Sequence, residues 1–202
     1  MPNAKTHQRG NVLREVSYAR SERARDALVI SPRCELMCMT YGQFSLVDAL
    51  SVILQQTGPA AVSVATWTAA EADLTRAEQF LREGAVTSLR FLVDRSFETR
   101  QPSYCAALRR LFGDTAIRTT RSHAKFATIR NAGWDLVVRT SMNLNHNPRL
   151  ENIEVSDDPG FADFVDSVFD EVWRGQPPGV FNGELPALRA QAGLRAGVAR
   201  SG

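Results

Sequence analysis

Polar residues that could do chemistry occur as three pairs in the second half of the chain, each with members two positions apart. The pairs are His123 with Lys125, Ser141 with Asn143, and Asn152 with Glu154. Residues two apart in a β-strand point to the same face of a sheet. Three neighbouring strands would therefore bring all six side chains to one place. Polar groups are costly to bury without partners, so this arrangement predicts a functional site.

These residue types suit the cleavage of a phosphodiester. A diester is an anion, so catalysis needs cations or donors on its non-bridging oxygens, a neutral nucleophile and an acid for the leaving oxygen. Histidine serves both proton roles, because imidazole titrates near neutral pH. In this interpretation Lys125 holds the phosphate oxygens, Asn143 donates a hydrogen bond to them, and Ser141 orients or polarises the group. Glu154 accepts the other N–H of His123 and so sets its tautomer. This chemistry requires no metal and no cofactor.

The lysine stands out in this composition. Only two of the 24 Lys and Arg residues are lysines, Lys5 and Lys125. A compact ammonium differs in size and geometry from a forked guanidinium, which indicates a site that needs lysine itself at position 125. Arg121 and Arg139 flank the pairs and are either contacts for a polyanionic substrate or outward-facing hairpin residues.

The pattern resembles the phospholipase D superfamily, whose H-x-K-x4-D motif is followed by G-S-x-N and then by N-x-E. The matching residues are His123, Lys125, Ser141, Asn143, Asn152 and Glu154. The resemblance spans most of the chain and implies a layered α/β fold and a site that joins two H-x-K motifs. Because this chain has one such motif, the resemblance implies a homodimer. In that dimer His123 of one subunit attacks phosphorus to form a phosphohistidine, and the partner's His123 protonates the leaving group.

Three features depart from the superfamily pattern. Arg130 stands where the motif has Asp, Thr140 stands where it has Gly, and the segment between Lys125 and Ser141 is about three residues longer than is common. If the motif Asp holds the strand pair that carries the histidine, Arg130 leaves a phosphate-binding pocket without turnover. Asp94, at the end of a predicted strand, either replaces the missing Asp or binds its own loop.

The expected function is therefore a metal-independent phosphodiesterase, and specifically a nuclease. The alternative is a catalytically degenerate phospholipase D-like module that binds nucleic acid or a partner without cleaving it. Phosphatidyl transfer is a third interpretation. The net charge of the chain is only +2, but both of its termini are basic. Nucleic acid is preferred to lipid for that reason, since basic termini suit a polyanion, although they are equally typical of a solvated chain end.

The elements that must position these residues alternate between strands and helices, which predicts a mixed, mostly parallel sheet flanked by helices. Strands are expected over 36–40, 61–67, 87–94, 115–118, 124–129, 134–140 and 153–156, with a hairpin turn at 130–133. Helices are expected to begin near Ser45, Thr68, Pro102 and Pro159.

The 202 residues predict one domain. A basic arm is expected over 1–26, the phospholipase D-like domain over 27–175, and a flexible Pro/Gly/Ala/Arg-rich tail over 176–202. No apolar stretch reaches the ~20 residues of a membrane helix, and the N-terminus lacks the apolar core of a secretory signal. A cytoplasmic protein without a membrane partner is expected. The three cysteines predict buried thiols rather than a disulfide framework or a zinc site.

Overall fold

The computed structural model describes residues 12, 14–20, 22–67, 69, 71–144 and 148–179. The predicted helix cap at Thr68 and most of the predicted C-terminal tail lie outside these residues. No helix within the described ranges is long and apolar enough to cross a membrane.

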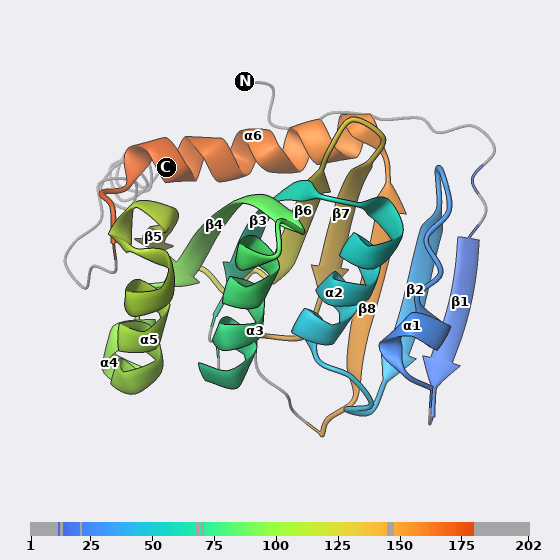
Figure 1. Cartoon of the computed structure of the whole chain (residues 1–202), viewed down its shortest axis with the longest axis horizontal. Coiled ribbons are helices and arrows are strands. Elements are labelled where there is room, and N and C mark those ends of the chain that lie inside the picture. Colours follow the sequence, from blue (N-terminus) through green and yellow to red (C-terminus); the bar gives the residue numbers. More distant parts are fainter. Residues whose placement is uncertain are drawn as a thin grey trace, which may run out of the picture.

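An eight-stranded sheet forms the centre of the molecule, in the order β1-β2-β8-β7-β6-β3-β4-β5 (Figure 1). Its strands are β1 (Arg14–Ala19), β2 (Glu35–Thr40), β3 (Ala60–Thr66), β4 (Val86–Asp94), β5 (Ile117–Thr120), β6 (Phe126–Arg130), β7 (Asp135–Thr140) and β8 (Glu151–Asp157). Parallel pairings join β1 to β2, β3 to β4 and β4 to β5, and the other four are antiparallel. The mixed sheet is confirmed. Parallel pairings are fewer than predicted, because the β6–β7 hairpin and the returning strand β8 occupy its middle.

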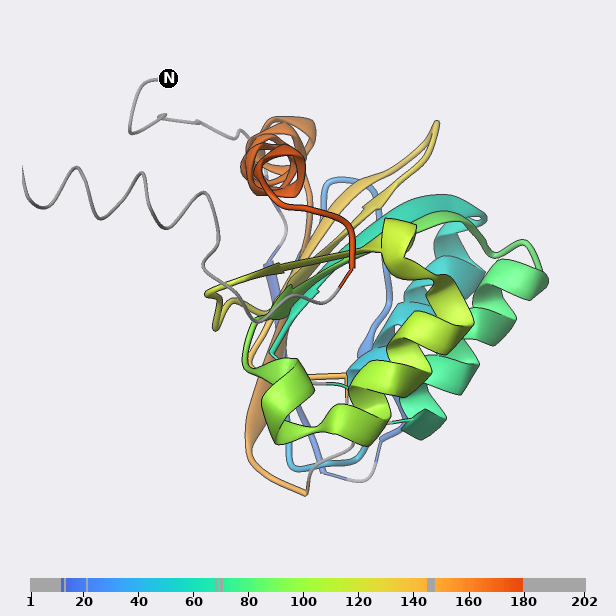
Figure 2. The ribbon, with the colours of Figure 1, turned by 90° about the vertical axis from the view of Figure 1, so that its left-hand side faces the viewer.

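Helices cover both faces of this sheet (Figure 2). On one face lie α2 (Leu46–Thr57), α3 (Glu71–Arg82) and α5 (Pro102–Phe112), and on the other lies α6 (Pro159–Gly175). Two single-turn helices, α1 (Ala24–Ala27) and α4 (Phe97–Arg100), and a 3-10 turn at Asp114–Ala116 complete the set. The predicted layered α/β architecture is therefore confirmed.

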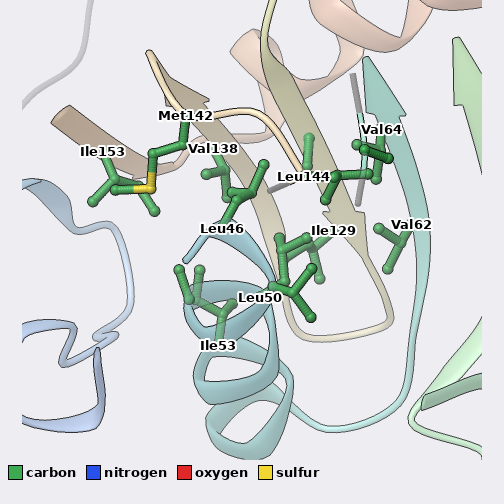
Figure 3. Packing of buried hydrophobic residues seen from close by; sticks show 14 of the residues in the cluster. Leu46, Leu50, Ile53, Val62, Val64, Ile129, Val138, Met142, Leu144 and Ile153 are labelled. Atoms are coloured by element: carbon green, nitrogen blue, oxygen red, sulfur yellow. The ribbon is translucent and has the colours of Figure 1, made fainter. Parts of the chain in front are cut away.

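The main core lies between the sheet and α2 (Figure 3). Leu46, Leu50 and Ile53 of α2 pack against the strands, as the helical spacing of these residues predicts. The predicted cap at Ser45 is also present: its hydroxyl accepts from the Asp48 N–H at 3.1 Å, and the Asp48 carboxylate accepts from the Ser45 N–H at 2.7 Å. Such a reciprocal cap satisfies two donors at the helix start.

The N-terminal segment is more structured than predicted. Residues 14–19 lie within the predicted basic arm but form the edge strand β1, parallel to β2. The hydrophobic pattern does not reveal this strand because its apolar side chains face outward: Val16 is 72% exposed and Tyr18 is 49% exposed. The three cysteines are free and buried, as predicted.

Candidate active site

The predicted site residues gather at one end of the sheet, where β6 begins, β7 ends and β8 begins. The pairing register places these three ends side by side, with Phe126 opposite Arg139 and Thr140 opposite Ile153. The carboxyl ends of β3 and β4 reach the same end, because β3 is antiparallel to β6. Five strand ends therefore surround the site.

His123 and Lys125 meet at this end, although the backbone that carries them differs from the prediction. Residues 122–125 form a loop before β6 and not its first residues. The Lys125 ammonium lies 3.3 Å from Nδ1 of His123 and donates to the His123 carbonyl at 3.1 Å. Since an ammonium can only donate hydrogen bonds, the contact favours the imidazole tautomer with its hydrogen at Nε2. The His123 side chain is exposed.

Ser141 lies beside this pair and binds a carboxylate from β8. Thr140, the last residue of β7, donates its N–H to the Lys125 carbonyl at 3.2 Å, which places Ser141 next to the lysine. The Ser141 hydroxyl donates to the Glu151 carboxylate and accepts from the Asn152 N–H at 3.0 Å. Burial lowers the pKa of Lys125, and the nearby Glu151 charge opposes that shift. Glu151 is therefore the acidic residue of the site.

The predicted role of Glu154 is wrong. Its carboxylate pairs with Arg139 at 2.7 Å, and the Arg139 guanidinium lies over the Phe161 ring of α6 at 5.2 Å. Ile153 and Val155 of β8 are buried in the main core, so the alternation of side chains turns Glu154 to the α6 face. Arg139 is thus part of the α6 packing.

The sequence contained the signal that identifies Glu151. This residue lies two positions before Ile153, so it shares the face of Ile153 and Val155 rather than that of Glu154. An assignment based on the buried apolar positions of β8 would have selected it, whereas matching the N-x-E spacing selected Glu154.

A matched pair of variants tests this correction. Glu151→Gln is expected to lower diester turnover about 10- to 100-fold, the usual cost of removing a group that orients reacting side chains. Glu154→Gln is expected to leave the rate within about twofold, because it breaks only a half-exposed ion pair. The measurement is kcat on a chromogenic diester for both proteins. The reverse order of effects would restore Glu154 to the site.

The remaining predicted site residues, Asn143, Asn152 and Arg121, each have different surroundings. The Asn143 side-chain oxygen accepts from the Trp67 N–H at 3.3 Å, which ties the loop after β7 to the end of β3. The Asn152 backbone binds Ser141 twice: its N–H donates to the Ser141 hydroxyl, and its carbonyl accepts from the Ser141 N–H. The Asn152 side chain lies on the same face of β8 as Glu154, the face toward α6. Arg121 is exposed in the loop before His123.

Asp94 binds both its own loop and the loop that carries His123. One carboxylate oxygen accepts from the N–H and hydroxyl of Ser96, and the other accepts from the Ser122 N–H at 2.9 Å. Burial alone would raise the pKa of Asp94, but these hydrogen bonds and the Arg95 charge hold it below its ordinary value. The carboxylate thus anchors the residue next to His123.

Arg130 lies at the opposite end of β6 from the site. It forms ion pairs with Asp135 at 2.6 Å, Asp163 at 3.0 Å and Asp166 at 3.1 Å. Asp135 is its cross-strand partner in β7, and the other two carboxylates belong to α6. The arginine therefore joins β6 to β7 and both strands to the helix.

The described ranges hold no group of three or more His, Cys, Asp or Glu side chains arranged to bind a metal ion. His146, which the Asn-rich loop carries, lies outside those ranges, as does His7.

Comparison with known proteins gives similarity in structure only. No protein-family model matches the chain, and no curated protein matches its sequence. Among solved structures, NucT from Helicobacter pylori has a TM-score of 0.50 and 15% identity, covering 71% of this chain and 99% of NucT. Nuc from Salmonella typhimurium, a phospholipase D family member, has a TM-score of 0.46 and 16% identity, covering 64% of this chain and 90% of Nuc. Together with the layers and strand order described above, the similarity to NucT shows that the chain has the predicted phospholipase D-like layered fold.

Proposed function

We propose that this chain is a metal-independent phosphodiesterase that cleaves nucleic acid through a phosphohistidine at His123. The observation that carries the proposal is the contact of Lys125 with Nδ1 of His123, next to the linked pair Ser141 and Glu151. A nucleophile, a phosphate-binding cation and a positioned carboxylate thus lie at one exposed end of the sheet. These are the groups that transfer at a phosphodiester needs.

In the proposed first step, the diester draws the Lys125 ammonium from Nδ1 onto its non-bridging oxygens. The imidazole can then carry its hydrogen at Nδ1, which leaves the Nε2 lone pair free to attack phosphorus. A P–N bond forms as the P–O bond to the leaving group breaks, and a general acid protonates that oxygen. In the second step water attacks phosphorus, the P–N bond breaks and the acid, now a base, takes the water's proton.

His123 of the partner subunit is the proposed acid. His123 is the one histidine of residues 12–144 and 148–179 that the structure describes, and a two-fold axis at this end of the sheet would bring a second copy to the same phosphate. Each nucleophile would then face an equivalent imidazole. The enzyme is accordingly proposed to act as a homodimer.

The position of Arg130 favours this proposal over the degenerate module. Arg130 lies five positions after Lys125, about 17 Å along the chain at the usual rise of a strand. Its ion pair with Asp135 links the two strands of the hairpin, which is the role assumed for the missing Asp. Loss of the motif Asp therefore need not weaken the part of the chain that carries His123 and Lys125.

The proposal is tested with purified full-length protein, bis-p-nitrophenyl phosphate and a labelled single-stranded oligonucleotide. We expect cleavage of both, an acid-labile phosphoryl group on His123 in quenched reactions, and a dimer by light scattering. Salt-dependent binding of the oligonucleotide without cleavage and without the phosphoryl group would instead establish the binding module.

Activity is expected to survive EDTA. In the proposed chemistry Lys125 neutralises charge on the phosphate and the partner's His123 protonates the leaving oxygen, so the charge stabilisation that metal ions supply in two-metal nucleases is not needed. The measurement compares the turnover of bis-p-nitrophenyl phosphate before and after dialysis against EDTA. Complete inhibition that magnesium or manganese reverses would contradict the mechanism.

A further inference from the structure

A guanidinium is held over an aromatic ring beside the proposed active site. The Arg100 guanidinium lies 3.9 Å from the centre of the Trp67 indole, and the same indole lies 5.6 Å from the His123 ring. Arg100 belongs to α4, which follows β4, whereas Trp67 follows β3. The ends of β3 and β4 thus place this guanidinium and His123 beside the same indole ring.

The backbone that carries Arg100 is fixed in place. Phe97, in the same turn of helix, is 1% exposed and packs in the main core. The Arg100 N–H donates to the Ser96 carbonyl at 2.9 Å, and Ser96 is in turn bound to the Asp94 carboxylate that anchors the loop before His123. A pre-organised donor loses less conformational entropy when it binds a ligand.

Arg100 differs from three of the four other arginines that lie over aromatic rings in the described part of the chain; the fourth, Arg20, lies over Tyr18 in the N-terminal segment. Arg90 and Arg118 both lie over Trp173, but Arg90 pairs with Asp170 and Arg118 donates to backbone carbonyls. Arg139 over Phe161 pairs with Glu154. No carboxylate among the described residues pairs with Arg100, whose side chain is exposed. The ring occupies the face of its guanidinium and leaves the N–H groups at the edge for an oxyanion.

The space next to this guanidinium is small. Trp67, Ser96, Phe97, Arg100 and Gln101 line a pocket of about 130 Å³. This volume is below the ~300 Å³ at which sites for whole small molecules begin. It suits a single group of phosphate size that belongs to a longer ligand extending across the site.

We propose that Arg100, stacked on Trp67, binds the phosphate next to the scissile one in a polynucleotide. This inference rests on the proposed function and specifies its substrate as a diester with at least two phosphates. Such a substrate places one phosphate on Lys125 and His123 and the next on Arg100. A diester with a single phosphate leaves Arg100 unused.

The test measures binding without turnover, in protein that carries His123→Ala. The ligands are a dinucleotide with one phosphate and a trinucleotide with two, neither with terminal phosphates, and affinity is measured by calorimetry. Adding Arg100→Gln is expected to weaken trinucleotide binding about 10- to 100-fold, as loss of a charge-assisted hydrogen bond does. Dinucleotide binding should stay within about twofold.

Arg82→Gln in the same background is the matched control. Arg82 ends α3, far from the site, and pairs with Glu78 on its own helix. Arg82→Gln removes the same charge and should change the affinity for neither the dinucleotide nor the trinucleotide. An equal effect of Arg100→Gln on both ligands, or no effect on either, overturns the proposal.

A second readout separates this inference from the proposed function. With His123 intact, Arg100→Gln should lower kcat/KM for an oligonucleotide by a larger factor than kcat/KM for bis-p-nitrophenyl phosphate, because that diester has one phosphate. If the parent protein does not cleave it at all, the proposed function fails, while the calorimetry still decides whether Arg100 recognises a second phosphate.

Discussion

His123→Ala is expected to lower the turnover of bis-p-nitrophenyl phosphate by at least about 10³-fold. The side chain supplies both the nucleophile and, in the partner subunit, the acid, and loss of general acid–base catalysis alone typically costs 10²- to 10⁴-fold. The melting temperature of the His123→Ala protein should match that of the parent protein, because the His123 side chain is exposed and lies outside the core.

Mixed dimers make this prediction specific to the proposed mechanism. If each reaction needs one imidazole from each subunit, a dimer of one parent chain and one His123→Ala chain should lose most of its activity. Half of the parental activity in purified mixed dimers would show that each subunit works alone. Parental activity in the homodimeric variant would remove His123 from the chemistry.

Lys125→Arg is expected to reduce kcat about 10²-fold, although it keeps the charge. The ammonium fits between Nδ1 and the carbonyl of one residue, His123, whereas a guanidinium is planar, wider and forked. The predicted loss in kcat is the same as that caused by removing one hydrogen-bond donor to a developing oxyanion. Turnover of the chromogenic diester by this variant near the parental rate would show that any cation suffices.

The pH profile gives an independent measure of the same lysine. Burial lowers the pKa of Lys125, and the Glu151 charge only partly opposes this. The ammonium must be charged to hold phosphate, so kcat/KM should begin to fall at a lower pH than for an exposed lysine. The residual activity of Lys125→Arg should lack this alkaline decline, because a guanidinium stays protonated. An unchanged decline would assign it to another group.

Local sequence was enough for much of the fold and for the contact between His123 and Lys125 in the candidate site. Ser45 predicted the start of α2, the Arg130–Gly133 turn predicted the β6–β7 hairpin, and Pro159 predicted the start of α6. His123 and Lys125 were paired correctly even though they lie in a loop. Two residues separated by one other are neighbours in any extended backbone, so that contact does not depend on the strand assignment.

Contacts between distant segments were decided by the tertiary structure. The role of Arg130 depends on carboxylates of α6 more than thirty residues away. Arg100 meets Trp67 only because β3 and β4 pair in parallel and end at the same edge. The sequence by itself thus determined the elements and the His123–Lys125 pair, because local propensity and short spacing produce them. Only the packing of the sheet decided which anchor and which further cation surround that pair, because those partners are brought together by strand order and not by position in the chain.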